Sequence, residues 1–240
     1  MTVLLIALHL FLGKPDSPET AVKSPSVYEG IAMDAKTGLP LYKEEHEEIS
    51  ENGICIGLRT VFRDVHNNVI AKRTVSFRDN ETIPNFQMED ERDGYLEGAR
   101  VSGDSVHLFW RKNHKSTLNE TTVLIPEPAV VDAGFNNFVK LHWDELLEGS
   151  TLEFNFGAAF ALDYYRFRIF KKSGTIVDGR ERVVMQCDID NFLVRLFVKP
   201  IVLTYDVETR RLVEYEGISN INDDRGKSHF VRIQYNPFGP

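Results

Sequence analysis

The chain has 240 residues, of which 42% are hydrophobic and 11% aromatic, and its formal net charge is -8 at pH 7. This hydrophobic content is sufficient for a buried core and excludes an intrinsically disordered chain. The negative charge disfavours binding to nucleic acids and electrostatic docking on anionic lipid, both of which need a basic face. Two cysteines, Cys55 and Cys187, are too few for a disulfide framework; they are either buried free thiols or one disulfide.

The N-terminus begins with an apolar run, MTVLLIALHLFLG, over residues 1–13. This run is too short to cross a bilayer as a helix, but it resembles the apolar part of a secretory signal. No Lys or Arg precedes the run, and no small-x-small cleavage site follows it. If it is a signal, the protein is periplasmic or otherwise exported; if it is not, the protein is cytoplasmic. Residues 14–27 are polar and Pro-rich and predict a tether, followed by a single β-rich domain over residues 28–240.

The first half of this domain predicts strands joined by short turns. Residues 41–49 (LYKEEHEEI) are polar on both faces, which favours an edge or rim strand. Residues 54–78 predict a hairpin with Asn67 and Asn68 at its turn. Apolar residues share one face of the return strand, and Arg73 interrupts that face. Arg73 is therefore either a polar anchor inside the domain or an arginine that extends to water.

A helix is expected in the middle of the chain, over residues 130–148 (VVDAGFNNFVKLHWDELLE). Residues with a spacing of about 3.6 mark its apolar face: Val131, Phe135, Phe138, Leu141, His142 and Leu146. Pro126 and Pro128 prevent an earlier start, and Asp132 is a candidate cap. A single apolar helix needs a large partner to bury it, and the only large partner available is a sheet.

The second half again predicts strands. Leu152, Phe154 and Phe156 share one face, whereas Phe167 has the opposite parity, so we expect a bulge or break near Asp163. Consecutive strands with short turns pair antiparallel, and about ten of them must curl. The predicted fold is mainly β, with one large curved antiparallel sheet of about ten strands wrapped around a single helix at about residues 130–148.

The sequence contains no motif that predicts catalysis. None of its seven histidines has the spacing to another His or Cys that a metal site requires, and we predict no metal or cofactor. Four glutamates surround His46 between positions 44 and 48, and such a charge run favours a solvated rim over a general acid. No catalytic residue is therefore assigned.

Two strings resemble exported bacterial proteins of uncharacterised function: GYLEG at 94–98 and KPIVLTYDVETRRLVEYEGISNI at 199–221. Together with the expected sheet, the inserted helix and the signal-like segment, the chain resembles the periplasmic lipoprotein carriers of the Lol type. The resemblance is one of pattern over residues 28–240. It implies the handling of lipid or lipoprotein outside the cytoplasm, without chemistry.

The sequence leads to the hypothesis of a non-catalytic exported protein that binds an apolar ligand, a lipid or acyl chain, between the sheet and the helix. Membrane association would be peripheral at most. Large side chains expected to face the interior define the candidate ligand-binding site: Arg73, Trp110, Phe135, Phe138, His142, Phe154, Phe156, Phe167 and Tyr205. One alternative is an envelope structural or interaction module with a filled core and no ligand. A second alternative is an enzyme that uses the same cavity, which converging titratable groups would favour.

Overall fold

A computed structural model describes residues 26–191, 198–223 and 225–236. The predicted signal segment (residues 1–13) and most of the predicted tether lie outside this range, and β1 begins at Ser26. The strands are β1 (Ser26–Asp34), β2 (Pro40–Glu51), β3 (Ile54–Asp64), β4 (Val69–Ser76), β5 (Asn85–Asp90), β6 (Leu96–Ser102), β7 (Ser105–Arg111), β8 (Asn119–Val123), β9 (Ala129–Val131), β10 (Thr151–Ala158), β11 (Asp163–Val177), β12 (Arg180–Ile189), β13 (Ile201–Asp206), β14 (Leu212–Asn222) and β15 (Ser228–Asn236). The helices are α1 (Gly134–Leu141), α2 (Trp143–Leu147) and a short 3-10 turn, η1 (Ala159–Ala161).

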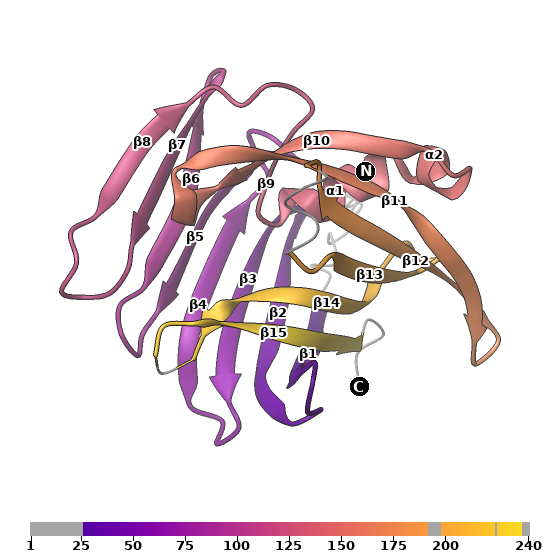
Figure 1. The fold of residues 1–240 in the computed structure, drawn as a ribbon, viewed down its shortest axis with the longest axis horizontal. Helices are drawn as coiled ribbons and strands as arrows, with labels where there is room; N and C mark the ends of the chain where they lie inside the picture. The colour runs from indigo at the N-terminus through magenta and orange to yellow at the C-terminus, as the bar shows by residue number, and fades with distance from the viewer. Residues whose placement is uncertain (1–25, 192–197, 224, 237–240) are drawn as a thin grey trace, which may run out of the picture.

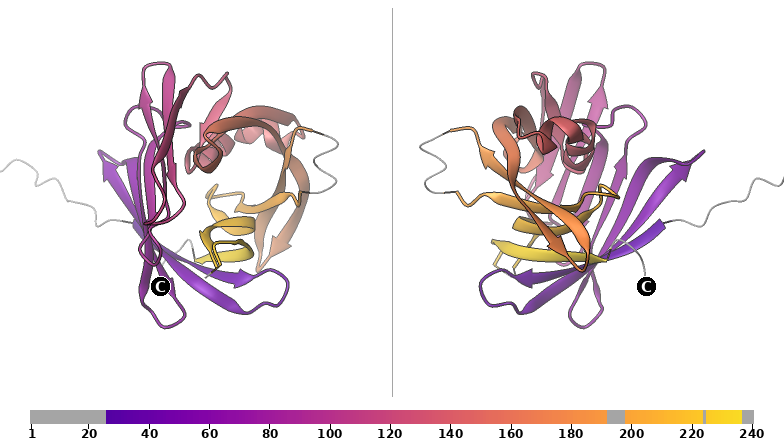
Figure 2. Two further views of the ribbon diagram at one scale, coloured as in Figure 1. Left: turned by 60° about the vertical axis from the view of Figure 1, so that its left-hand side comes forward. Right: turned by 90° about the vertical axis from the view of Figure 1, so that its right-hand side faces the viewer.

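All these strands belong to one sheet (Figure 1). The order across it is β8-β7-β6-β5-β4-β3-β2-β1-β15-β14-β13-β12-β11-β10-β9, so that β1 and β15 join the two halves and β8 and β9 are the edges. Every pair is antiparallel except β9 with β10. The second half of the sheet curls back over α1 and α2 and faces the first half (Figure 2). The prediction of a mainly β fold with one large curved sheet is confirmed.

The strand number differs from the prediction, since the described residues form fifteen strands in place of about ten. The additional strands are short or polar. Residues 119–123 (NETTV) form β8, and only three residues form β9. Such segments lack the alternation of apolar and polar residues that marks a strand in a sequence. Their backbone partners in the sheet determine them instead.

The single helix predicted over residues 130–148 is wrong in its bounds and its continuity. Residues 129–131 form β9, which pairs with β10, and the helical part is divided at His142 into α1 and α2. Asp132 does not cap the helix; Ala133 occupies that position, and its side chain makes no cap hydrogen bond. The predicted apolar face is also wrong at the last residue of α1. Leu141 is 60% exposed, although the spacing placed it with Phe138, which is buried.

The helices lie inside the curled half of the sheet and bury their apolar side chains there. Phe138, Trp143 and Leu146 pack in one cluster with residues from β10 to β13. The expected break near Asp163 is confirmed. The 3-10 turn η1 and Leu162, whose φ is 55°, separate β10 from β11. Even-numbered Phe154 is buried before this break, and odd-numbered Ile169 is buried after it. Within the described residues no helix has the length and apolar character needed to cross a membrane.

Candidate ligand-binding site

The interior holds a cavity of about 280 Å³, which we call cavity 1. It lies between the strands of the first half of the sheet, the start of α1, and the strands β10 and β13 to β15. Aromatic and aliphatic side chains form most of its wall: Tyr42, Phe62, Phe86, Phe135, Phe156, Ile201, Leu203, Tyr205, Leu212, Tyr215, Ile233 and Tyr235. Phe160 and Ile218 also belong to the wall, and both are more than half exposed, so the cavity reaches the surface beside them.

A second cavity, of about 200 Å³, lies next to the first along the strands; we call it cavity 2. The inward residues of β2 show the arrangement, because Tyr42 and Glu44 line cavity 1 while His46 and Glu48 line cavity 2. The two cavities share a wall that consists of Arg73, Ala133, Asn136, Leu212 and Tyr235. A rearrangement of these five side chains would join the two spaces.

An ion pair occupies the shared wall. The Arg73 guanidinium on β4 donates to both carboxylate oxygens of Asp132, at 3.3 and 3.5 Å. The side chains are 18% and 7% exposed. Asp132 has a φ of 43°, a conformation that Asp tolerates better than most residues. The Arg73 Nε and the Asn136 Oδ1 are buried without a partner among the described residues. Both atoms are therefore available to a ligand.

A second polar group lies between Arg73 and β1. His46 is buried, and its two ring nitrogens lie 3.0 Å from the Thr60 hydroxyl and 2.9 Å from a Glu44 oxygen. Tyr235 donates to the same Glu44 oxygen at 3.2 Å, and the Tyr28 ring stacks on His46 with centroids 4.5 Å apart. Burial raises the pKa of the Tyr28 hydroxyl well above its usual range, with a smaller contribution from Glu48. Both ring nitrogens of His46 therefore already have a partner within this group.

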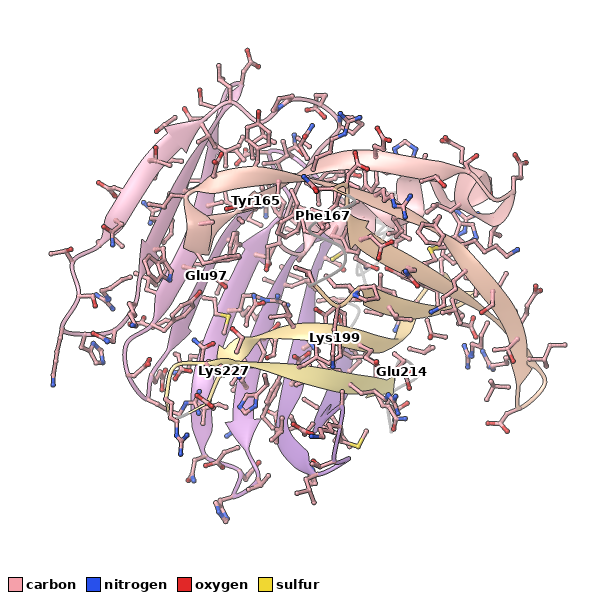
Figure 3. All side chains as sticks on the ribbon, in the orientation of Figure 1. Glu97, Tyr165, Phe167, Lys199, Glu214 and Lys227 are labelled. Carbon is pink, nitrogen blue, oxygen red and sulfur yellow. The ribbon has the colours of Figure 1, made fainter. Side chains whose placement is uncertain are left out.

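A buried carboxyl group completes the polar part of cavity 1. Glu97 lies on β6 (Figure 3). Its carboxylate accepts hydrogen bonds from the Tyr95 hydroxyl at 3.0 Å and from the Asn220 amide at 3.1 Å. Burial raises the pKa of Glu97 to about 7, and the negative charge of Asp132 contributes to the increase. Glu97 can therefore hold or release a proton near neutral pH, unlike an ordinary surface glutamate.

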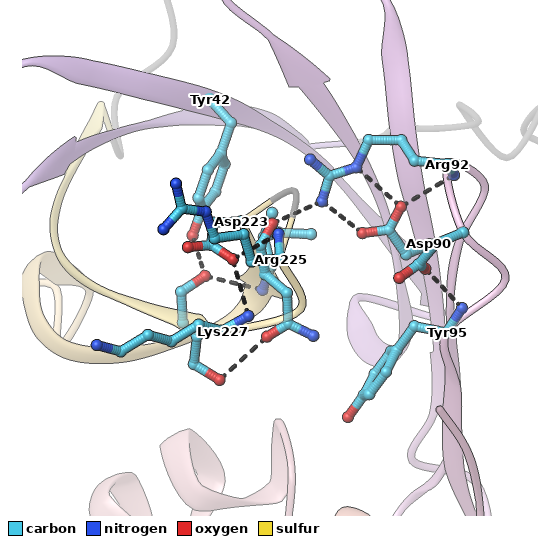
Figure 4. Close-up of polar contacts among 12 residues, drawn as sticks. Tyr42, Asp90, Arg92, Tyr95, Asp223, Arg225 and Lys227 are labelled. Atoms are coloured by element: carbon cyan, nitrogen blue, oxygen red, sulfur yellow. Dashed lines mark hydrogen bonds and ion pairs between the residues drawn. The ribbon is translucent and has the colours of Figure 1, made fainter. Parts of the chain in front are cut away.

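The end of β14 that supplies Asn220 is fixed to the first half of the sheet. The Arg92 side chain, in the turn between β5 and β6, donates to both oxygens of Asp90 and to the Asn222 carbonyl (Figure 4). The Tyr42 hydroxyl lies 2.7 Å from the Ser219 hydroxyl, which accepts from the backbone of Ile221. These contacts hold Ser219 and Asn220 at the wall of cavity 1.

The structure divides the predicted site residues into three groups. Arg73, Phe135, Phe156 and Tyr205 line cavity 1, and Arg73 also lines cavity 2. Three others pack beside the cavity: Phe138 and Phe154 in the buried core, and Phe167 against it. The remaining two, Trp110 and His142, belong to neither wall. His142 is partly exposed, and its Nδ1 lies 2.9 Å from a Glu145 oxygen.

Several wall residues escaped the sequence analysis, and β2 shows why. Residues 41–49 were expected at an edge or rim, but β2 pairs with both β1 and β3. Glu44 and His46, which the charge run placed in solvent, are 6% and 3% exposed. The alternation of Tyr42, Glu44 and His46 was a visible signal. Such a pattern does not predict an inward face, because polar residues rarely face a core.

The described part of the chain contains no group of three His, Cys, Asp or Glu side chains that could hold a metal ion. Cys55 and Cys187 are both free thiols. Cys187 is buried, which raises its pKa well above its usual range, whereas Cys55 is exposed and belongs to the wall of cavity 2. The expectation that both thiols are buried is therefore wrong for Cys55.

Comparison with known proteins finds a similar fold but identifies no family for the chain. No protein-family model and no curated protein matches the chain. Among solved structures, the chain is similar to the "beta-barrel-like protein of domain of unknown function DUF1849" from Brucella abortus, with a TM-score of 0.52 and 10% sequence identity. The match covers 88% of this chain and 94% of the other. At this identity the similarity shows a shared mainly β fold alone.

Proposed function

We propose that the protein is non-catalytic and binds an amphiphilic ligand, a lipid or other acyl chain, in cavity 1. One observation supports the proposal: aromatic and aliphatic side chains surround an interior space that the described residues do not fill. Binding sites for small molecules have this character, with a mostly apolar wall and a few polar anchors. Arg73 is the expected anchor, because its side chain is only 18% exposed and its buried Nε has no partner among the described residues.

The unfilled interior favours this proposal over a structural module with a filled core. Cavities 1 and 2 have volumes of about 280 and 200 Å³, so together they reach the range of ligand pockets, roughly 300–1,000 Å³. The exposed side chains of Phe160 and Ile218 at the wall offer an apolar entrance. Packing in a filled core would leave few voids larger than a water molecule.

A fluorescent fatty acid tests the proposal, and its binding should saturate at one site. Ala133 belongs to the walls of both cavities, so Ala133→Phe should fill the space and abolish binding. Leu141→Phe is the matched control, because Leu141 is on the same helix and 60% exposed. Circular dichroism should show that both variants fold. If the folded wild type binds no apolar probe, or if Ala133→Phe binds as well as Leu141→Phe, the proposal fails.

We also propose that residues 1–13 direct export, in agreement with a role in lipid handling outside the cytoplasm. The segment has the length and apolar character of the central part of a signal. N-terminal sequencing of the protein from its native host should then begin after Gly13. Recovery of intact Met1 from the cytosolic fraction would contradict export without affecting the proposed ligand.

A second candidate function, an enzyme that uses the same cavity, is favoured by one observation. Glu97 is a buried carboxyl group with a pKa of about 7, and the charge of Asp132 acts on it within cavity 1. A buried carboxyl group that can exchange a proton near neutral pH is suited to acid–base catalysis. Incubation with acyl esters of nitrophenol would detect hydrolysis. Activity that Glu97→Gln abolishes, in a folded variant that still binds the fatty acid, would favour the enzyme.

A further inference from the structure

The two cavities differ in the charge of their walls. Three carboxylic acids, Glu44, Glu97 and Asp132, line cavity 1 against a single cation, Arg73. The charges that line cavity 2 are Arg73, Lys140 and Arg211 against a single carboxylate, Glu48. Both cavities open to the surface at one side, but charges in their walls are partly removed from water and are screened less than fully exposed ones. The interior therefore has an acidic part and a basic part that meet at Arg73.

Lys140 contributes a positive charge to the wall of cavity 2. Its ammonium group forms no hydrogen bond or ion pair with the described residues. Burial lowers the pKa of Lys140, and the charge of Arg211 lowers it further, while Glu48 acts in the opposite direction. A half-buried cation without a direct partner is stabilised when an anion binds beside it. The structure of cavity 2 thus favours an anionic guest despite the presence of Glu48.

Arg73 offers a second donor at the boundary between the cavities. Its terminal nitrogen binds Asp132, while its Nε–H is buried and points to no acceptor among the described residues. An oxygen of a ligand that extends from cavity 2 to the shared wall would satisfy this donor. Guanidinium donors bind carboxylate and phosphate oxygens especially well.

From this arrangement we infer that cavity 2 binds an anionic head group, a carboxylate or a phosphate, of the same ligand whose apolar chain occupies cavity 1. Lys140, Arg211 and the Arg73 Nε would hold the head group, and the chain would pass the shared wall beside Leu212. This assignment rests on the proposed function. The opposite orientation would place an anion among Glu44, Glu97 and Asp132, where like charges repel it.

Ligands of equal chain length and different charge test the inference. Dodecanol, dodecanoate, dodecyl phosphate and dodecylammonium would be titrated below their micelle concentrations by calorimetry or by displacement of the fluorescent fatty acid. The two anions should bind at least about tenfold tighter than the alcohol, because hydrogen bonds to an ionised group are roughly twice as strong as neutral ones. The better of the two anions identifies the head group.

The outcomes separate this inference from the proposed function. If none of the four compounds binds, both fail. If the alcohol or the ammonium compound binds as well as the anions, the chain site stands and the anionic head-group site is overturned. In Lys140→Met, the ratio of anion affinity to alcohol affinity should fall to less than about a third of its wild-type value. The affinity for dodecanol itself should not change, because the substitution removes a charge and keeps the apolar stem. Lys172→Met, at an exposed position of β11, is the matched control and should change neither affinity.

The alkylation rate of Cys55 can report whether a ligand occupies cavity 2. This thiol is exposed and belongs to the wall of the cavity, whereas Cys187 is buried. Saturation with the preferred anion should slow alkylation of Cys55 by N-ethylmaleimide several-fold, measured by mass spectrometry under conditions in which Cys187 does not react. An anion that binds without slowing this reaction would occupy another place, and the assignment to cavity 2 would be wrong.

Discussion

Arg73 on β4 and Asp132 at the start of the helical segment form an ion pair across the interior, although 59 residues separate them in the sequence. The pair belongs to the wall of cavity 1, and Arg73 also faces cavity 2. It joins the first half of the sheet to the segment that leads into α1. The contact therefore links the segment before α1 to the charge at the boundary between the cavities.

Removal of the negative charge from this pair should destabilise the fold. Asp132→Asn keeps a residue that tolerates the positive φ of 43°, but it leaves the Arg73 charge buried without a counterion. We expect a loss of roughly 3–5 kcal/mol in the free energy of unfolding, the usual cost of breaking a buried pair. Urea unfolding monitored by circular dichroism measures it.

The matched control for this prediction is Glu153→Gln, which breaks an ion pair with Arg166 at the surface. Those side chains are 49% and 60% exposed. The control should cost less than about 1 kcal/mol, because water screens exposed pairs. Equal losses in the two variants would show that solvent reaches the Arg73 pair as well.

Phe138 should be the main apolar anchor of α1. Its side chain is 3% exposed, and its ring centroid lies 5.1 Å from that of Phe154. Phe138→Ala should lower the free energy of unfolding by roughly 3–5 kcal/mol, as large-to-small changes in a core do. Leu141→Ala, on the same helix but 60% exposed, should stay within about 0.5 kcal/mol. A loss of similar size at both positions would mean that α1 packs with a different face.

The sequence predicts the parts of this fold in which apolar periodicity and burial coincide. Val106 and Leu108 alternate in β7 and are buried, and Val231 and Ile233 do the same in β15. The break between β10 and β11 could also be predicted, because the inward parity changes there. A strand that is buried on one face has alternating apolar and polar residues, and this alternation can be recognised in the sequence.

The candidate site is less predictable because its polar residues lie where a core would be apolar. Glu97 and His46 have inward positions, but local sequence cannot distinguish an inward glutamate from an outward one. Each has one partner two residues away and one from another strand: Asn220 for Glu97, and Thr60 for His46. The division of the helix at His142 is equally hidden, since the spacing of apolar residues continues across it. Tertiary contacts determine these features, and propensity alone does not reveal them.

Glu97 should make the stability of the fold depend on pH. Burial, assisted by the charge of Asp132, raises its pKa from an ordinary 4.5 to about 7. Between pH 4.5 and pH 7, Glu97 is protonated in the folded protein but has lost its proton in the unfolded chain. The contribution of Glu97 to stability therefore falls as the pH rises from 4.5 to 7, and above pH 7 the buried carboxylate costs roughly 3 kcal/mol.

Glu97→Gln removes this titration while keeping an amide oxygen that can accept from Tyr95 or Asn220. Relative to the wild type, the variant should gain little stability near pH 4.5 and progressively more up to about pH 8. Urea unfolding of both proteins across this range measures the difference, from which other titrating groups cancel. Glu208→Gln, in the exposed turn after β13, is the control and should give a difference that does not change with pH in this window. A constant difference for Glu97→Gln would show that water or a counterion reaches this carboxyl group, and the polar part of cavity 1 would then be open to solvent.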